Sequence, residues 1–349
     1  MGLDQPGLED SPIIRGRTAP AGSPRPWLVT GTVRLRAVAV RRSHRDCGRD
    51  GSTPLPDRRP RRSPPARRSG LARQFAAVLT ALIGTTMAVF VSSASGSEQI
   101  AIPVGPMALR AIVFRPHGTG PFPAVIGLHG CGGLSVGTAG LLPQYADWAE
   151  RLVSAGVVVL FPDSYASRGL GSQCSNRNSP IRNAVERVAD AKAARVWLQN
   201  QPGIAARRIS LLGWANGAIA ALWAVRPLAV AKDDQPDFRS AVAFYPGCRR
   251  LSETAWNARV PTLLLVGSAD DWTPAGPCEQ MVAGAEGRSA RVVIVVYPGA
   301  HHNFDDPDQP LSQRSNLAFS ADGSGRAHVA TDPRARADAL KRVPEWLLR

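Results

Sequence analysis

The chain has 349 residues and a formal net charge of +15, from 42 lysines and arginines against 27 aspartates and glutamates. A chain of this length can bury a full hydrophobic core, as one large domain or two small ones. The charge alone would suggest nucleic acid or an anionic membrane as a partner, but residues 1–74 hold 16 arginines and only 6 acidic residues. The main body is therefore mildly basic, and its composition does not indicate nucleic-acid binding.

Residues 1–74 are rich in arginine, proline, glycine and serine and show no sustained apolar period. Such a segment cannot bury enough apolar surface to offset the entropy of ordering, so we predict that it is disordered. A nucleic-acid-binding arm is one interpretation, although the aromatic residues and lysines typical of such arms are nearly absent. The other interpretation is an over-called start of the reading frame. The whole chain has three lysines among its 42 basic residues, and such an arginine bias is expected of a GC-rich coding sequence.

Residues 75–96 have the pattern of a secretory signal peptide. Arg67, Arg68 and Arg73 precede an apolar run at 75–91, and small residues follow at 92–96. A signal anchor is the alternative, because a run of 17 residues is near the lower limit for a membrane span. We favour cleavage near Ala94, which predicts a periplasmic or secreted mature protein with no stable membrane span.

From residue 97 onward, short apolar runs alternate with amphipathic stretches, which predicts one doubly wound α/β domain over 97–349 with a mostly parallel sheet. An antiparallel hairpin is expected first, at 99–104 and 110–114. Ligand sites in such folds form at the carboxyl ends of the strands. The remaining strands are predicted at 124–128, 157–161, 209–212, 241–244, 262–266 and 292–296, and the helices at 144–155, 181–199, 218–225 and 333–348.

Gly213-Trp214-Ala215-Asn216-Gly217 lies between a predicted strand and a predicted helix. Flanking glycines at this junction are typical of a nucleophile elbow, a tight turn that lifts its middle side chain above the sheet. The middle residue here is Ala215, which has neither hydroxyl nor thiol and cannot attack a carbonyl. Ser210 lies inside the preceding strand and offers no substitute.

Two further strand ends supply an acid and a base. Asp270 follows the strand at 262–266, with Asp271 as the fallback, and His302 follows the last strand. A carboxylate in this place can accept the Nδ1 proton of a histidine and stabilise its imidazolium form. Alone, such an aspartate would more often be a helix cap, but the order nucleophile, acid, histidine favours a triad.

The glycine-rich turn His129-Gly130-Cys131-Gly132-Gly133 follows the strand at 124–128. Acyl transfer needs backbone N–H groups that stabilise the developing oxyanion, one from this loop and one from the residue after the nucleophile. We therefore assign the amides of Cys131 and Asn216 to an oxyanion hole.

These motifs together resemble the exported branch of the dienelactone hydrolase family, over about residues 98–349. The resemblance rests on L-H-G-C-G-G from Leu128, P-D-S-Y-A-S-R-G-L-G-S-Q-C from Pro162, G-W-A-N-G from Gly213, F-Y-P-G-C from Phe244, D-D-W-T-P-A-G-P-C from Asp270 and Y-P-G-A-H-H-N-F-D from Tyr297. It implies the α/β-hydrolase fold and hydrolysis of esters or lactones, with Asp270 as acid and His302 as base. Dienelactone hydrolases proper carry a cysteine nucleophile and an acidic residue near Gly130, whereas this chain resembles a branch with serine in the elbow and has Ala215 instead.

Ala215 predicts that hydrolysis is lost or strongly reduced. The alternative is a non-catalytic periplasmic protein that binds small molecules in the same pocket. No metal ligands with suitable spacing and no nucleotide or organic cofactor motif are present, so the expected partner is a small ester or lactone.

Side chains at the strand ends predict two more features. Tyr165, Arg168, Trp214 and Trp272 are expected to line the mouth of the site, where Arg168 could meet a substrate carboxylate. The four cysteines of the mature chain are expected to pair as Cys131 with Cys174 and Cys248 with Cys278, which would hold the loops of the site.

Overall fold

The computed structural model describes residues 96–135, 140–227 and 235–349. All of them belong to one compact unit, Thr85–Arg349. The disordered extension expected at 1–74 and the signal segment expected at 75–96 lie outside the described residues, except for Gly96.

An eight-stranded sheet forms the centre of this unit, in the order β1-β2-β4-β3-β5-β6-β7-β8. The first two strands pair as an antiparallel hairpin, β2 is antiparallel to β4, and all later pairs are parallel. The mostly parallel sheet predicted from the sequence is therefore confirmed. The strands are β1 (Ser97–Val104), β2 (Met107–Phe114), β3 (Phe122–Leu128), β4 (Val158–Pro162), β5 (Ile204–Trp214), β6 (Ala241–Phe244), β7 (Thr262–Gly267) and β8 (Val292–Tyr297).

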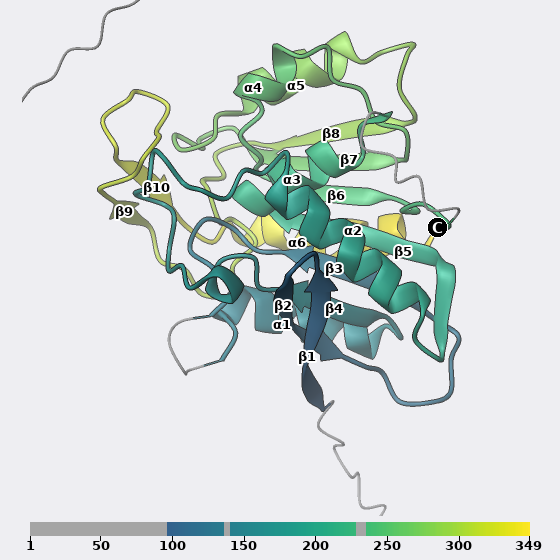
Figure 1. The fold of residues 1–349 in the computed structure, drawn as a ribbon. Coiled ribbons are helices and arrows are strands. Elements are labelled where there is room, and N and C mark those ends of the chain that lie inside the picture. The colour runs from purple at the N-terminus through teal and green to yellow at the C-terminus, as the bar shows by residue number, and fades with distance from the viewer. Residues whose placement is uncertain (1–95, 136–139, 228–234) are drawn as a thin grey trace, which may run out of the picture. The chain divides into compact units, whose positions relative to one another are not determined.

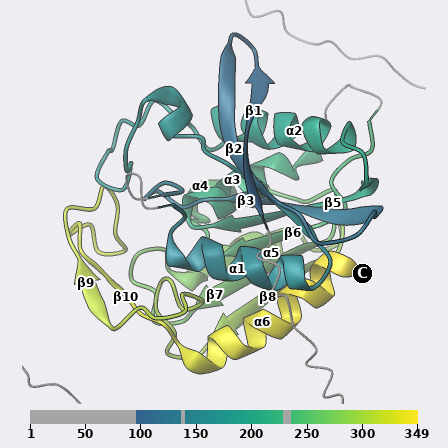
Figure 2. The same ribbon diagram turned by 90° about the horizontal axis from the view of Figure 1, so that it is seen from below.

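Helices cover both faces of the sheet (Figures 1 and 2). On one face, α1 (Pro143–Ser154) and α6 (Pro333–Leu348) pack on the strands through a core that includes Trp148 and Val343. On the other face, α2 (Glu186–Gln199), α3 (Asn216–Ala224), α4 (Arg249–Ser252) and α5 (Ala275–Gly284) share a second core. Each face of every central strand is thus buried, which explains the continuous apolar runs in the sequence.

The carboxyl ends of β3, β5, β6, β7 and β8 lie along one edge of the sheet, because these strands are parallel neighbours. The glycine-rich turn, Ala215, Asp270 and His302 follow the ends of four of these strands. Sheet topology therefore brings to one edge the segments that carry the candidate site.

Two features differ from the prediction. Helix α2 begins at Glu186 rather than near Ile181, because residues 181–185 form a turn in which the Glu186 carboxylate accepts a hydrogen bond from the Arg182 amide at 2.7 Å. The sequence also gave no sign of the short pair β9 (Ser312–Arg314) and β10 (Ala327–Val329), since three-residue strands are too short to show a period. This hairpin lies between the loop of His302 and α6.

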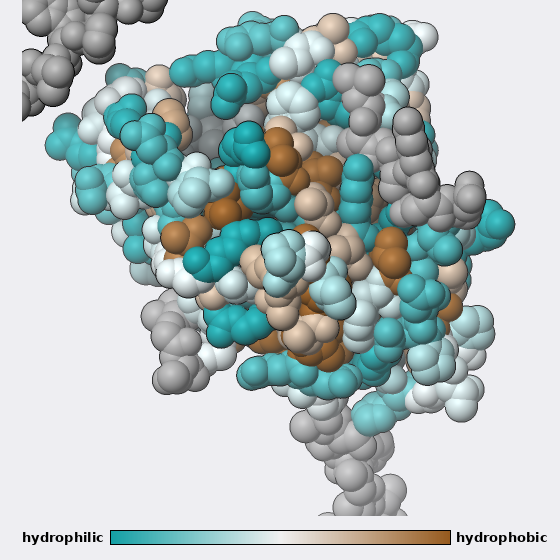
Figure 3. Space-filling view, in the orientation of Figure 1, coloured by the Kyte–Doolittle hydropathy of each residue, from teal (hydrophilic) through white to brown (hydrophobic). Residues whose placement is uncertain are grey.

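Two disulfides join the cysteine pairs expected from the sequence, Cys131 with Cys174 and Cys248 with Cys278. In the described part of the chain, no helix is both long enough and apolar enough to cross a bilayer. Figure 3 shows apolar residues in several small areas among polar ones on the face drawn there.

Replacing both Cys248 and Cys278 by alanine should lower the free energy of unfolding. The bond closes a loop with a sequence separation of 30, and loop-closure entropy for such a loop corresponds to about 3 to 4 kcal/mol. Urea unfolding of the two proteins without reductant measures the difference. Equal unfolding free energies would contradict this expectation.

Candidate active site

Ala215 occupies a sharp turn between the end of β5 and the start of α3. Its backbone has φ 48° and ψ −112°, a region that residues with a β-carbon rarely adopt. The turn is held because the Ala215 amide donates to the Phe244 carbonyl at 3.0 Å and the Ala215 carbonyl accepts from the Ile219 amide at 3.0 Å. The backbone therefore has the strained form of a nucleophile elbow although the side chain is a methyl group.

The flanking glycines are required by close backbone contacts. A β-carbon on Gly213 would lie 2.5 Å from the Gly217 carbonyl oxygen, and a β-carbon on Gly217 would lie 1.7 Å from the Leu128 carbonyl oxygen. No side chain fits at either position. The elbow consequently packs directly on the end of β3, beside the glycine-rich turn.

Asp270 and His302 form a buried pair at neighbouring strand ends. His302 Nδ1 lies 2.8 Å from Asp270 Oδ2. His302 is only 2% exposed and Asp270 only 4%. The other carboxylate oxygen, Asp270 Oδ1, accepts from the amides of Trp272 and Thr273 at 2.9 and 2.8 Å. With its Nδ1 proton donated to Asp270, the imidazole has its Nε2 lone pair free to accept a proton.

Thr273 also belongs to this site, and sequence reasoning missed it. Its hydroxyl lies 2.9 Å from Asp270 Oδ2, 3.0 Å from His302 Nδ1 and 3.0 Å from the Tyr245 carbonyl oxygen. The threonine follows Asp270 by three residues, the spacing at which a side chain and a backbone amide often hydrogen-bond in a turn. It connects the acid to the loop after β6.

Two aromatic rings pack against the imidazole of His302. The ring centroids of Tyr245 and Trp272 lie 4.3 and 4.7 Å from its own. Tyr245 is fully buried, whereas Trp272 is partly exposed. The histidine therefore has one ring behind it and one at the surface.

Asp271, the fallback for the acid, lies elsewhere. Its carboxylate accepts from His328 of β10, at 2.7 Å from both the ring Nδ1 and the backbone amide. The geometry accordingly favours Asp270 as the partner of His302, and Asp271 holds the β9–β10 hairpin to the loop after β7.

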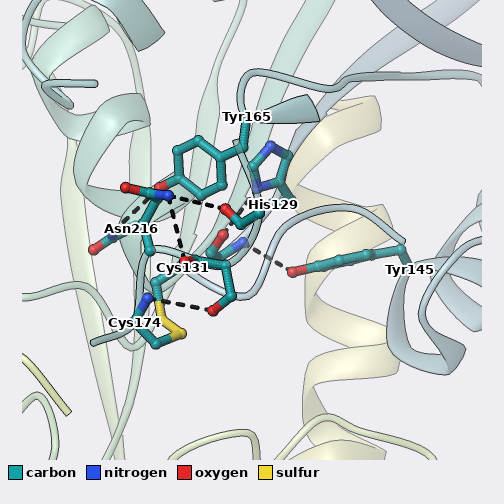
Figure 4. The surroundings of a disulfide bond; sticks show 10 residues. His129, Cys131, Tyr145, Tyr165, Cys174 and Asn216 are labelled. Carbon is teal, nitrogen blue, oxygen red and sulfur yellow. Dashed lines mark hydrogen bonds between the residues drawn. A yellow bond between two sulfur atoms is a disulfide. The ribbon is translucent and has the colours of Figure 1, made fainter. Parts of the chain in front are cut away.

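The amides of Gly130 and Cys131 in the glycine-rich turn differ in their hydrogen bonds. The Gly130 amide donates to the Tyr145 hydroxyl at 2.8 Å, from helix α1. Among the described residues, no acceptor lies within hydrogen-bond range of the Cys131 amide, while the Cys131 carbonyl accepts from Gln173 at 2.8 Å. Figure 4 shows the Cys131–Cys174 disulfide near Asn216, with Tyr145 reaching toward the turn from the opposite side.

The amide of Asn216 is the first in helix α3, and the first amides of a helix have no partner within it. The Asn216 side chain lies 3.4 Å from the Tyr165 hydroxyl. The amides of Cys131 and Asn216 both belong to turns beside Ala215, and neither makes a hydrogen bond to the described residues.

Two of the residues expected at the mouth of the site are elsewhere. Trp214 is 1% exposed, and its indole nitrogen donates to the buried Asp305 at 2.8 Å, because the side chain before the elbow points to the core face of β5. Arg168 does not reach toward a substrate, since its guanidinium donates to both oxygens of the buried Asp190 at 2.7 and 2.9 Å. The predictions for Trp214 and Arg168 were wrong. Tyr165 is also buried, at 2% exposure, although its hydroxyl lies 3.4 Å from the Asn216 side chain, whereas Trp272 is partly exposed beside His302.

His129 is buried in its neutral form beneath the glycine-rich turn. Its Nδ1 lies 2.8 Å from the Gly130 carbonyl oxygen, and its Nε2 accepts from the Ser164 amide at 3.2 Å. Burial and the Arg187 guanidinium hold the pKa of His129 well below its ordinary value of 6.5. Protonation would place an N–H at Nε2 against the Ser164 N–H, so acid disfavours this part of the fold.

No group of three or more histidine, cysteine, aspartate or glutamate side chains in the described ranges could hold a metal ion.

Comparisons with a family profile and with individual known proteins agree on one family. The sequence profile of the dienelactone hydrolase family matches residues 109–349. A Yersinia pestis protein named "Putative carboxymethylenebutenolidase" is 26% identical over 219 residues, covering 58% of this chain and 76% of that protein.

Solved structures share the fold. The crystal structure of a "Putative Dienelactone Hydrolase" from Klebsiella pneumoniae aligns with a TM-score of 0.55 at 22% identity, over 72% of this chain and 98% of that one. A dienelactone hydrolase-like promiscuous phosphotriesterase, P91 from metagenomic libraries, aligns with a TM-score of 0.55 at 19% identity, over 72% and 97% of the two chains.

Gly217→Ala should strongly destabilise the protein, because the new methyl group would meet the Leu128 carbonyl oxygen. We expect a loss of about 3 kcal/mol or more in unfolding free energy. Gly276→Ala in α5 is the control, since nothing lies within 4 Å of its β-carbon position, and it should be neutral or stabilising by up to about 1 kcal/mol. Equal effects of the two substitutions in urea unfolding would refute the close contact.

Stability should fall as the pH drops through and below 6.5, because the unfolded state then takes up a proton that folded His129 excludes. The slope contributed by this residue approaches about 1.4 kcal/mol per pH unit. His129→Gln cannot titrate and should show a shallower fall between about pH 7 and about pH 5. Parallel pH profiles of the two proteins in urea unfolding would contradict this account.

Proposed function

The chain belongs to the dienelactone hydrolase family, and on that premise we propose that its site is that of a carboxylic ester or lactone hydrolase from which the nucleophile is missing. Hydrolysis is then lost or strongly reduced in the chain as it stands. The roles of Ala215, Asp270 and His302 as nucleophile position, acid and base are part of this proposal.

One observation carries it: Ala215 retains the backbone of an elbow, φ 48°, in a chain that also retains the Asp270–His302 pair at 2.8 Å. Strained backbone of this kind costs of order 1–3 kcal/mol and persists where the surrounding structure requires it. A methyl group gains nothing from being lifted above the sheet. The geometry suits a hydroxyl at the same position.

With a hydroxyl at position 215, the chemistry follows from the surrounding groups. His302 Nε2 accepts the hydroxyl proton as the oxygen attacks the carbonyl carbon of the ester, and Asp270 stabilises the resulting imidazolium. The amides of Cys131 and Asn216 donate to the oxyanion, and His302 then returns the proton to the leaving alcohol. Water repeats the sequence on the acyl intermediate and releases the acid.

The substrate class in this proposal is a small ester or lactone. The partly exposed Trp272 beside His302 supplies flat apolar surface next to the proposed reacting position. The Arg168 guanidinium donates to both oxygens of Asp190, so this proposal gives Arg168 no role in binding a substrate carboxylate. The names given to related proteins support this class without identifying the ester.

We also propose that the protein acts in the periplasm or outside the cell. The two disulfides, Cys131–Cys174 and Cys248–Cys278, support this location because disulfides persist in oxidising compartments. The signal pattern at 75–96 supports it independently.

Ala215→Ser should create hydrolysis of a short activated aryl ester. Loss of the nucleophile in a serine hydrolase typically lowers kcat by about 10⁶, so the substitution should raise the rate by about 10³-fold or more over the chain as it stands. The rate of release of the aryl alcohol, followed by absorbance, measures the gain.

Two controls accompany this assay. Ala283→Ser makes the same chemical change at an exposed position of α5 and should add no activity, and His302→Ala in the Ala215→Ser background should remove the gain. If Ala215→Ser folds but remains inactive, the triad is wrong and a binding protein on the same fold becomes the better account.

A further inference from the structure

Asp305 is a buried carboxylate that the proposed chemistry does not use. It lies three residues after His302 and has no exposed surface. Its two oxygens accept four hydrogen bonds. Oδ1 accepts from Gln144 Nε2 at 2.8 Å and the Tyr245 hydroxyl at 2.7 Å, and Oδ2 accepts from the indole nitrogens of Trp148 and Trp214 at 2.8 Å each.

The hydrogen-bond partners favour the ionised form of Asp305. Amide and indole N–H groups can only donate, and the Tyr245 hydroxyl itself accepts from Gln144 at 2.6 Å, so its own proton points to Asp305. A protonated carboxyl would set its O–H against one of these donors. Burial raises the pKa of Asp305 above its ordinary value, and the hydrogen bonds from Tyr245, Trp214 and Trp148 offset part of this rise.

Two of the donors belong to the parts of the site that would react. Trp214 immediately precedes Ala215 in the elbow. The Tyr245 ring packs against the His302 imidazole at 4.3 Å, and the Tyr245 carbonyl accepts from the hydroxyl of Thr273. Asp305 itself lies on the loop of His302.

The other two donors belong to helix α1. Gln144 is adjacent to Tyr145, whose hydroxyl accepts from the Gly130 amide of the glycine-rich turn, and Trp148 lies one turn further along the same helix. A single buried charge therefore connects the elbow, the histidine loop, the tyrosine behind the histidine and the helix behind the oxyanion loop.

We propose that Asp305 is a positioning residue, whose buried negative charge sets His302, the elbow and the glycine-rich turn in register with one another. Its catalytic consequence rests on the proposed function, but its effect on His302 does not. Because displacement of a catalytic group by about 1 Å can cost about 10² in rate, loss of this charge should lower kcat far more than it changes KM.

Asp305→Asn tests this, because it keeps the shape of the side chain but replaces one acceptor oxygen by an NH₂ group that faces donors. In the full chain with Ala215 unchanged, the proton resonance of His302 Nδ1–H, which reports its bond to Asp270, should shift or broaden. In the Ala215→Ser background, kcat should fall by about 10²-fold with KM changed by less than about threefold.

The matched control is Asp237→Asn, which removes a carboxylate bonded to Arg259 at the opposite end of the sheet. It should lower stability while leaving the His302 resonance and kcat unchanged. A merely structural role for Asp305 predicts that both aspartate substitutions lower stability and leave the His302 resonance and kcat unchanged.

Tyr245→Phe removes one donor to Asp305 and keeps the ring against His302. It should give a smaller change of the same kind, and it replaces Asp305→Asn if that variant does not fold.

The outcomes separate the two proposals. If Ala215→Ser is inactive, the proposed function fails and the His302 resonance in the Ala215 chain alone decides the role of Asp305. A folded Asp305→Asn or Tyr245→Phe protein with an unchanged His302 resonance overturns the positioning role, even if Ala215→Ser is active.

Discussion

The close approach of the elbow to the end of β3 is the constraint on which the site depends. Gly217 lies against the Leu128 carbonyl oxygen so tightly that no β-carbon fits, and Gly213 packs against Gly217 in the same way. This contact brings the start of α3 beside the glycine-rich turn and forces the positive φ of Ala215 between them. Two free amides and one lifted side chain follow from a single backbone contact. The fold therefore keeps the form of a nucleophile elbow whether or not residue 215 can react.

The polar groups around that elbow form two layers. Asp270, Thr273 and His302 make the upper one, and the hydrogen bonds within it fix which imidazole nitrogen carries the proton. Asp305 and its four donors make the lower layer, and all five of these residues are buried. Tyr245 belongs to both layers, through its ring and carbonyl above and its hydroxyl below. Buried polar networks are costly unless every member is bonded, so their completeness in a chain with Ala215 favours a machinery that has lost one atom rather than a pocket shaped for another purpose.

The fold could be predicted from the sequence because buried parallel strands leave continuous apolar runs and glycine marks the turns. The site was predictable as far as it follows strand ends, which gave Ala215, Asp270 and His302. Side-chain direction was not. Trp214 and Arg168 were expected at the mouth, but one points to the core and the other pairs with Asp190, a residue more than twenty positions away. Asp305 was missed for the same reason: its four donors come from three separate segments that only the folded chain brings together.

The central claim is that one missing atom separates this site from a working hydrolase, and covalent labelling tests it most directly. A fluorophosphonate probe should add one equivalent to the Ala215→Ser protein, with the adduct on the peptide that contains position 215, and none to the chain as it stands. Intact-protein and peptide mass spectrometry read the result. Absence of an adduct in a folded Ala215→Ser protein, or labelling of the unsubstituted chain at another residue, would contradict the account.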